Sequence, residues 1–192
     1  ILVMFLGLTI GFIKVVNAGN VTIAQIAHLK ARGDFAYPAG GFYTGGGLLS
    51  IESNGTIYDD GQIDVGGDGS GTIAFIAEGD VTIDTHASTQ GVGVSNVPDL
   101  GDKFADGGSL EIRSMTGNIT ILQNVMLSGT NQAAGGFVDL TAAKSITIDA
   151  TIDLSGGGGD GGQMDVAAAD NVTIKRSINA SRWSSSSRAC LL

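Results

Sequence analysis

The chain has 192 residues, of which 31 are glycine and two are proline, and its 19 acidic side chains outnumber the 10 basic ones. The glycines do not recur at every third position, which excludes a collagen triple helix. The formal net charge of −9, with no basic stripe, excludes a nucleic-acid-binding surface, because such a surface must attract phosphates. The low charge content and the many Val, Ile and Leu residues argue against disorder.

The chain opens with an apolar run that ends at Lys14, and the small-residue segment Val16-Asn17-Ala18 follows. This order is typical of a secretory signal peptide, here without its basic leader. The run is short for a bilayer span. We therefore predict that residues 1–18 are a signal peptide cut after Ala18, so that the mature protein is secreted or held at the cell surface without a membrane span. The alternative is a membrane anchor that is never removed.

Residues 19–46 contain a copy of a later segment, because Asn20-Val21-Thr22-Ile23 matches Asn171-Val172-Thr173-Ile174 letter for letter. The match predicts that residues 20–29 form the last two strands of an opening layer. The alternative is a short amphipathic helix that caps the fold. A long connector follows this segment.

Residues 47–181 repeat one pattern, in which a glycine leads an alternation of apolar and other residues. The pattern starts at Gly47, Gly71, Gly108, Gly136 and Gly162. A second alternating phrase, VTI or ITI, follows four of these starts, at Val81, Ile119, Ile146 and Val172, and a third begins at Gln62, Val125, Thr151 and Ser177. Alternation with a period of two predicts short strands with one buried side.

Three short strands in each repeat of about 25 residues, with no helix, predict an all-β fold: a right-handed, single-stranded parallel β-helix of about five rungs. One rung cannot bury its apolar row alone, so successive rungs must stack. We expect two inward columns: Leu110, Ile112, Val138, Leu140, Met164 and Val166 in the first strands, and Ile121, Ile148 and Ile174 in the second.

Residues 182–192 have no strand rhythm and contain a serine run and Cys190, the only cysteine. We interpret them as a polar tail or the end of a fragment, and predict that the remainder of a longer chain is among the partners of this segment.

Two long connectors, 30–47 and 90–108, leave the same corner of the predicted rungs. Long loops on a rigid scaffold are the usual place for binding, and aromatic rings beside carboxylates can stack on sugars and bind their hydroxyls. The candidate ligand-binding residues are Tyr37, Phe42, Tyr43, Asp99, Asp102, Lys103 and Phe104. The alternative is that these aromatic side chains fold down and close the open end of the core.

The outward position in the middle of the first strands gives a second candidate site. Its occupants are Ser50, Ala74, Glu111, Asp139 and Asp165. Stacked like charges repel one another, so either water screens the three carboxylates or Ca²⁺ bridges them. Arg113 lies on the same face. No other cofactor is predicted. The second strands place an outward column of Thr82, Thr120, Thr147 and Thr173.

The stretch IDLSGGGGDGGQMDVAAADNVTI, which begins at Ile152, resembles the repeats of bacterial secreted β-helix proteins, in the style of filamentous-haemagglutinin-like adhesins. The layout of short and long connectors is also similar to pectate-lyase-like enzymes. The second resemblance implies that Glu111, Asp139 and Asp165 would hold Ca²⁺ and that Arg113 would abstract a proton.

These observations predict a secreted or cell-surface module with a structural or adhesive role that binds a polysaccharide or a surface ligand. The alternative is a polysaccharide lyase or hydrolase that cleaves acidic glycans with the help of calcium. Fold resemblance alone does not decide between these two functions.

Overall fold

The computed structural model describes residues 12–25, 27–30, 47–65, 71–84, 107–129 and 133–182, and within these ranges it contains strands and no helix. The predicted all-β class is therefore confirmed for this part of the chain. Accordingly, none of the described residues belongs to a helix that could cross a membrane.

The strands fall into units that follow one another along the chain. First strands are six residues long: β1 (Phe12–Asn17), β4 (Leu48–Ser53), β7 (Thr72–Ala77), β9 (Ser109–Ser114), β12 (Phe137–Ala142) and β15 (Gln163–Ala168). Second strands are β2 (Val21–Ile23), β5 (Ile57–Asp59), β8 (Val81–Ile83), β10 (Ile119–Ile121), β13 (Ile146–Ile148) and β16 (Val172–Ile174). Third strands are β3 (His28–Lys30), β6 (Gln62–Asp64), β11 (Val125–Met126), β14 (Ile152–Asp153) and β17 (Ile178–Asn179).

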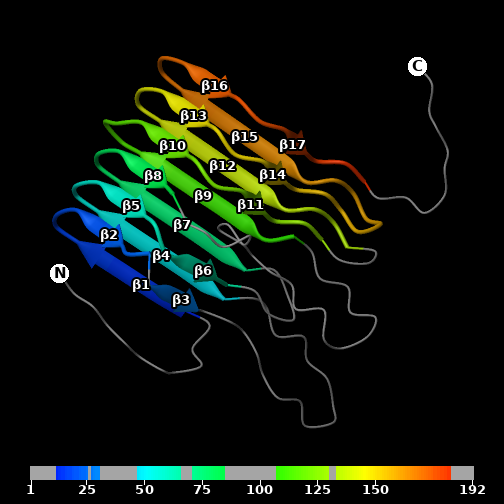
Figure 1. Ribbon diagram of the computed structural model, residues 1–192, viewed down its shortest axis with the longest axis horizontal. Coiled ribbons are helices and arrows are strands. Elements are labelled where there is room, and N and C mark those ends of the chain that lie inside the picture. Colours follow the sequence, from blue (N-terminus) through cyan, green and yellow to red (C-terminus); the bar gives the residue numbers. More distant parts are fainter. Residues whose placement is uncertain are drawn as a thin grey trace, which may run out of the picture.

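Strands of the same kind pair with one another in parallel. The first strands form a sheet in the order β1-β4-β7-β9-β12-β15, and the second strands form a sheet in the order β2-β5-β8-β10-β13-β16. The third strands form the sheets β3-β6 and β11-β14-β17. First and second strands thus pair with their counterparts in adjacent units throughout the described chain, and the units lie in chain order along the stack (Figure 1). Third strands do so within two separate groups, because the unit of β7 and β8 has no described third strand.

The core consists of the inward side chains of all three kinds of strand, which form one continuous apolar cluster. In the first strands, the predicted inward residues Leu110, Ile112, Val138 and Leu140 have no exposed surface. Every further layer removes two such side chains from water, at roughly 1.5–3 kcal/mol for each fully buried side chain. Stacking is thereby the source of the stability that a single unit lacks.

The last unit is the exception to this burial. Met164 and Val166 pack against the cluster but are only partly buried, and Ile174 is 46% exposed although it is in register with the buried Ile148. The predicted column of Ile121, Ile148 and Ile174 is confirmed by register, but its last member is more exposed than the others. The physical reason is that no described strand lies beyond β16 to cover it.

The leading glycines have a steric role at the entry to the first strands. A Cβ added at Gly135 would overlap the carbonyl oxygen of Leu154 at the end of the same unit, and a Cβ at Gly162 would overlap the carbonyl oxygen of Gly136 in the unit before. The chain approaches the neighbouring backbone so closely at these points that only glycine fits. This contact explains why the repeated pattern begins with glycine.

The first unit contains more strand structure than the sequence pattern predicts. The strands expected within residues 20–29 are confirmed, because β2 pairs with β5 and β3 pairs with β6. In addition, Phe12–Asn17 pairs along its whole length with β4, and Lys14 forms an ion pair of 2.7 Å with Glu52. Strand pairing does not test whether residues 1–18 are removed after export, and the signal peptide stays a prediction.

Candidate functional site

The outward face of the first-strand sheet carries an acidic column of Glu111, Asp139 and Asp165. These residues lie in register on β9, β12 and β15, as the sequence pattern predicts. The same column continues through Ala74 and Ser50 to Lys14 on β1. The face is therefore acidic at one end of the sheet and carries a cation at the other.

Arg113 lies between two members of the acidic column. Its Nε is 2.5 Å from Oε1 of Glu111, and one of its terminal nitrogens is 3.8 Å from Oδ2 of Asp139. Asp139 also accepts a hydrogen bond of 3.4 Å from the hydroxyl of Thr141. The guanidinium thus reduces the repulsion between the two carboxylates, and because the side chains are partly exposed each such pair contributes less than about 1 kcal/mol.

Asp165 has a different partner from the other two carboxylates. Both of its carboxylate oxygens accept hydrogen bonds from Nε2 of Gln163, at 3.1 and 3.0 Å. In the part of the chain that the structure describes, no three His, Cys, Asp or Glu side chains are grouped so that they could hold a metal ion. The calcium site at Glu111, Asp139 and Asp165 stays a prediction.

Phe137 belongs to this face and was missed by the sequence analysis. It is 39% exposed, lies two residues before Asp139, and is in register between Ser109 and Gln163. Its side chain therefore points to the same side as the acidic column. The sequence signal was available: in the aligned repeats, Phe137 is an aromatic residue at an outward position. We name Glu111, Arg113, Phe137, Asp139, Gln163 and Asp165 the aromatic–acidic face.

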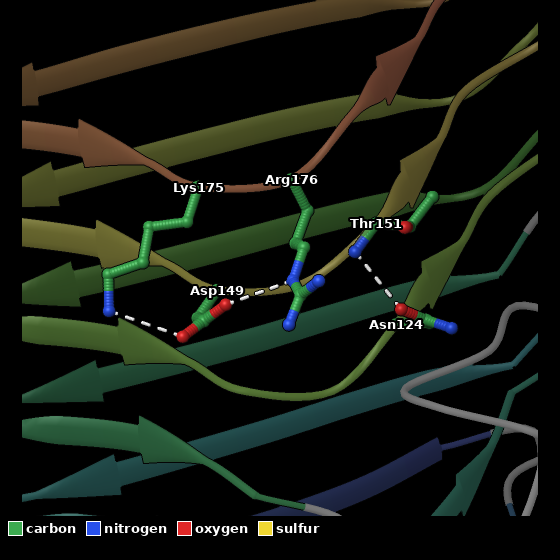
Figure 2. A network of polar contacts seen from close by, with 5 residues as sticks. All are labelled: Asn124, Asp149, Thr151, Lys175 and Arg176. Atoms are coloured by element: carbon green, nitrogen blue, oxygen red, sulfur yellow. Dashed lines mark hydrogen bonds and ion pairs between the residues drawn. The ribbon is translucent and has the colours of Figure 1, made fainter.

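A second polar cluster joins the last three described units on another side of the stack (Figure 2). Asp149 accepts hydrogen bonds from Nζ of Lys175 at 3.2 Å and from Nε of Arg176 at 3.1 Å. These hydrogen bonds, first that from Lys175 and then that from Arg176, lower the pKa of Asp149 below its usual value of 3.8. Nearby, Oδ1 of Asn124 accepts a hydrogen bond of 3.0 Å from the backbone N–H of Thr151. Every contact of this cluster joins neighbouring units, so we assign it to stability.

Asp59 is a buried carboxyl group inside the apolar core. It has no exposed surface and stands in register with Ile23 and Ile83. Its Oδ1 accepts a hydrogen bond of 3.0 Å from the backbone N–H of Gly61, whereas Oδ2 has no hydrogen-bond partner among the described residues. Burial is the main cause that raises its pKa from 3.8 to about 7. Asp59 is too enclosed to meet a polymer, and it acts on stability instead.

The remaining predicted residues have mixed outcomes. The threonine column is confirmed, because Thr82, Thr120, Thr147 and Thr173 lie in register on the second-strand sheet. The ligand-binding candidates Tyr37, Phe42, Tyr43, Asp99, Asp102, Lys103 and Phe104 lie outside the described residues. Their role in binding stays a prediction from the sequence.

Comparison of the chain with protein-family models, with curated proteins and with solved structures gives no significant match. The resemblance to secreted β-helix proteins therefore rests on the sequence pattern, and function must be argued from the faces of the molecule.

Proposed function

We propose that the chain is a right-handed parallel β-helix, secreted or at the cell surface, with a structural or adhesive role and carbohydrate as its ligand. The β-helix is supported by parallel pairing of first strands with first strands and of second strands with second strands in successive units, and by the apolar cluster that all three kinds of strand share. The exported location is supported by the apolar start of the sequence.

The observation that carries the binding role is the aromatic–acidic face. An exposed ring such as Phe137 can stack on the apolar face of a sugar, while the neighbouring carboxylates and the Gln163 amide exchange hydrogen bonds with its hydroxyls. The parallel strands repeat their side chains at roughly 4.8 Å, so the face is an extended surface that suits a polymer.

Arg113 favours binding over the alternative, a lyase or hydrolase. Its guanidinium forms ion pairs with Glu111 on its own strand and with Asp139 on the next. The same ion pairs hold its side chain across β9 and β12, where it can donate hydrogen bonds to a ligand. The enzymatic alternative is tested in the same experiment.

The test incubates the protein with soluble plant, algal and bacterial polysaccharides and measures polymer size and co-elution by light-scattering chromatography. We expect unchanged polymer size and co-elution with one class of polymer. Phe137→Ala should weaken this binding by roughly tenfold or more, the loss expected for removing one stacked ring. Arg113→Ala should weaken binding, and the polymer should keep its size with the variant as with the wild type.

The matched control is Tyr58→Ala. Tyr58 is also an exposed ring, 38% exposed, but it lies on β5 of the second-strand sheet and not on the aromatic–acidic face. Equal losses from Tyr58→Ala and Phe137→Ala would refute binding at the aromatic–acidic face. If the wild-type protein shortened the polymer and Arg113→Ala did not, the lyase alternative would replace the proposed function.

A further inference from the structure

The aromatic–acidic face carries more negative than positive charge. Three successive strands of the first-strand sheet place Glu111, Asp139 and Asp165 in one outward column, and Arg113 is the cation that lies among them. Three carboxylates and one guanidinium leave these four residues with a net charge of −2. Paired strands repeat their side chains at roughly 4.8 Å. A ligand that lies along the column therefore meets a carboxylate in each of the three layers.

Arg113 neutralises the members of this column unequally. Its Nε is 2.5 Å from Oε1 of Glu111, whereas its terminal nitrogen is 3.8 Å from Oδ2 of Asp139, which is beyond hydrogen-bonding distance. Among the described residues, the Asp139 carboxylate accepts one hydrogen bond, a long one of 3.4 Å from the hydroxyl of Thr141. Its side chain is 28% exposed. The Asp139 carboxylate can therefore accept further hydrogen bonds from a ligand.

Phe137 places an aromatic ring next to this carboxylate. Both residues lie on β12 and point to the same side of the sheet, and β12 is paired with β9 on one edge and with β15 on the other. An exposed aromatic ring attracts a cation as well as the apolar face of a sugar. Strand β12 thus offers a surface for a sugar ring and, beside it, an acceptor for a positively charged group on that ring.

The charge of the face distinguishes between classes of polysaccharide. An acidic glycan would bring its own anionic groups next to Glu111 and Asp139, and like charges repel one another. A neutral glycan would separate these carboxylates from water without supplying a compensating charge. A glycan with ammonium groups supplies that charge and donates charge-assisted hydrogen bonds to the carboxylates. The face is therefore most complementary to a cationic glycan.

We propose that the ligand of the aromatic–acidic face is a polymer of amino sugars whose amino groups are not acetylated. A sugar ring stacks on Phe137, its ammonium group donates to the Asp139 carboxylate, and neighbouring sugars along the column meet Glu111 and Asp165. This inference rests on the proposed carbohydrate-binding function, because it names the ligand class of the same face.

The first test compares two oligosaccharides of the same backbone and length, one of glucosamine and one of N-acetylglucosamine, by isothermal titration calorimetry. The pH is mildly acidic, so that the sugar amines are protonated and ordinary carboxyl groups are ionised. We expect the glucosamine oligomer to bind roughly tenfold more tightly, because several partly exposed ion pairs act together. Added salt should reduce this preference, because it screens the charges. An oligogalacturonate should bind more weakly than either oligomer.

The second test removes the charge of Asp139. Asp139→Asn should lower the affinity for the glucosamine oligomer roughly three- to fivefold, as expected for one partly exposed ion pair, and leave the affinity for N-acetylglucosamine unchanged. The matched control is Asp170→Asn, at an exposed carboxylate that follows β15 and lies off the face. The control should leave both affinities unchanged. Circular dichroism checks that each variant is folded.

Three results would overturn the proposal. The first is binding of the N-acetylglucosamine oligomer that is as tight as that of the glucosamine oligomer. The second is an equal loss of affinity from Asp170→Asn and Asp139→Asn, which would show an effect of overall charge rather than of the face. The third is binding of polylysine that is as tight and as sensitive to Asp139→Asn, which would make the ligand a cationic peptide instead of a glycan.

Failure of this inference and failure of the proposed function give different results. If both oligomers bind equally and Phe137→Ala weakens both, the face binds carbohydrate but does not select amino sugars. If no glycan binds, or if Phe137→Ala leaves binding unchanged, the proposed function and this inference are both wrong.

Discussion

At the scale of single residues, Asp59 is unfavourable for folding, because its carboxyl group is buried in the apolar core. The inward column of the second strands is isoleucine at Ile23, Ile83 and Ile121, and a carboxyl group replaces it once, in the second unit. Burial raises the pKa of Asp59 to about 7, the N–H of Gly61 acts in the opposite direction, and the charge of Asp60 raises the pKa further. The neutral form of Asp59 is therefore the one that the folded state favours.

The pH dependence of stability should follow from this shift. The carboxyl group titrates near its ordinary value of 3.8 in the unfolded chain and near 7 in the folded one, so between these values the folded state binds more protons. Its contribution to stability is therefore greatest at about pH 4 and falls by up to about 4 kcal/mol as the pH rises to about 7, with no further loss above. Urea unfolding of Asp59→Asn and wild type across this range measures the effect.

The difference between the two proteins is the informative quantity, because other groups also titrate. Asp59→Asn should be the more stable protein at pH 8, and its advantage should shrink steadily toward pH 4. A difference that is constant with pH would show that Asp59 is not buried in an apolar environment.

At the scale of single elements, the entry to each first strand is fixed by close backbone contact. Gly135→Ala should lower the free energy of unfolding by about 1–3 kcal/mol, because its new Cβ meets the Leu154 carbonyl and the backbone must shift. Chemical denaturation measures the loss. Gly19→Ala is the control, since a Cβ there meets no atom within 4 Å. Similar losses at both positions would mean that glycine acts through chain entropy rather than through contact.

Most strands could be predicted from the sequence because the same alternating pattern recurs in successive repeats. Alternation in the phrases at Gly108, Gly136 and Gly162 identified the inward and outward sides correctly. It could not identify β1, because an apolar strand and the core of a signal peptide share one composition. It also missed Asp59, although the triplet Ile57-Tyr58-Asp59 departs from VTI and ITI at the position that faces the core.

The candidate site was predicted in part. The acidic column and the side of Arg113 follow from counting along the strands, and register pairing confirms both. Phe137 was missed because the alternation was used to find apolar residues that face inward, and an exposed aromatic residue breaks that rule. The ion pairs of Arg113 depend on the side-chain conformations, which no sequence pattern specifies.

At the scale of the whole molecule, each unit contacts the unit before it and the unit after it. In such a stack, stability is approximately a sum over units and over the contacts between neighbours. Among the described residues, the first and last units have one neighbour each, and as such they should unfold locally at lower free energy than the middle units. The structure shows the cause of this difference: the side chains of β16 are exposed, whereas the apolar side chains of β13, in register with them, are buried.

The register of the second strands allows the contribution of a neighbour to be measured. Ile148→Ala removes a fully buried side chain, and should cost about 2–5 kcal/mol of unfolding free energy. Ile174→Ala makes the same chemical change one layer further on, at 46% exposure, and in dilute solution should cost less than about 1 kcal/mol. Equal costs would show that the outer layer is covered in solution.

In-register pairing has a consequence for how this chain can be studied. Val81, Ile119, Ile146 and Val172 share one column, with one backbone geometry and similar side chains. The same substitution can therefore be made at several positions that differ mainly in the number of layers around them. Comparison among them cancels side-chain chemistry and intrinsic strand preference, which usually obscure such measurements. Differences in the free energy of unfolding among these variants would therefore measure how much a neighbouring layer contributes by burying a side chain.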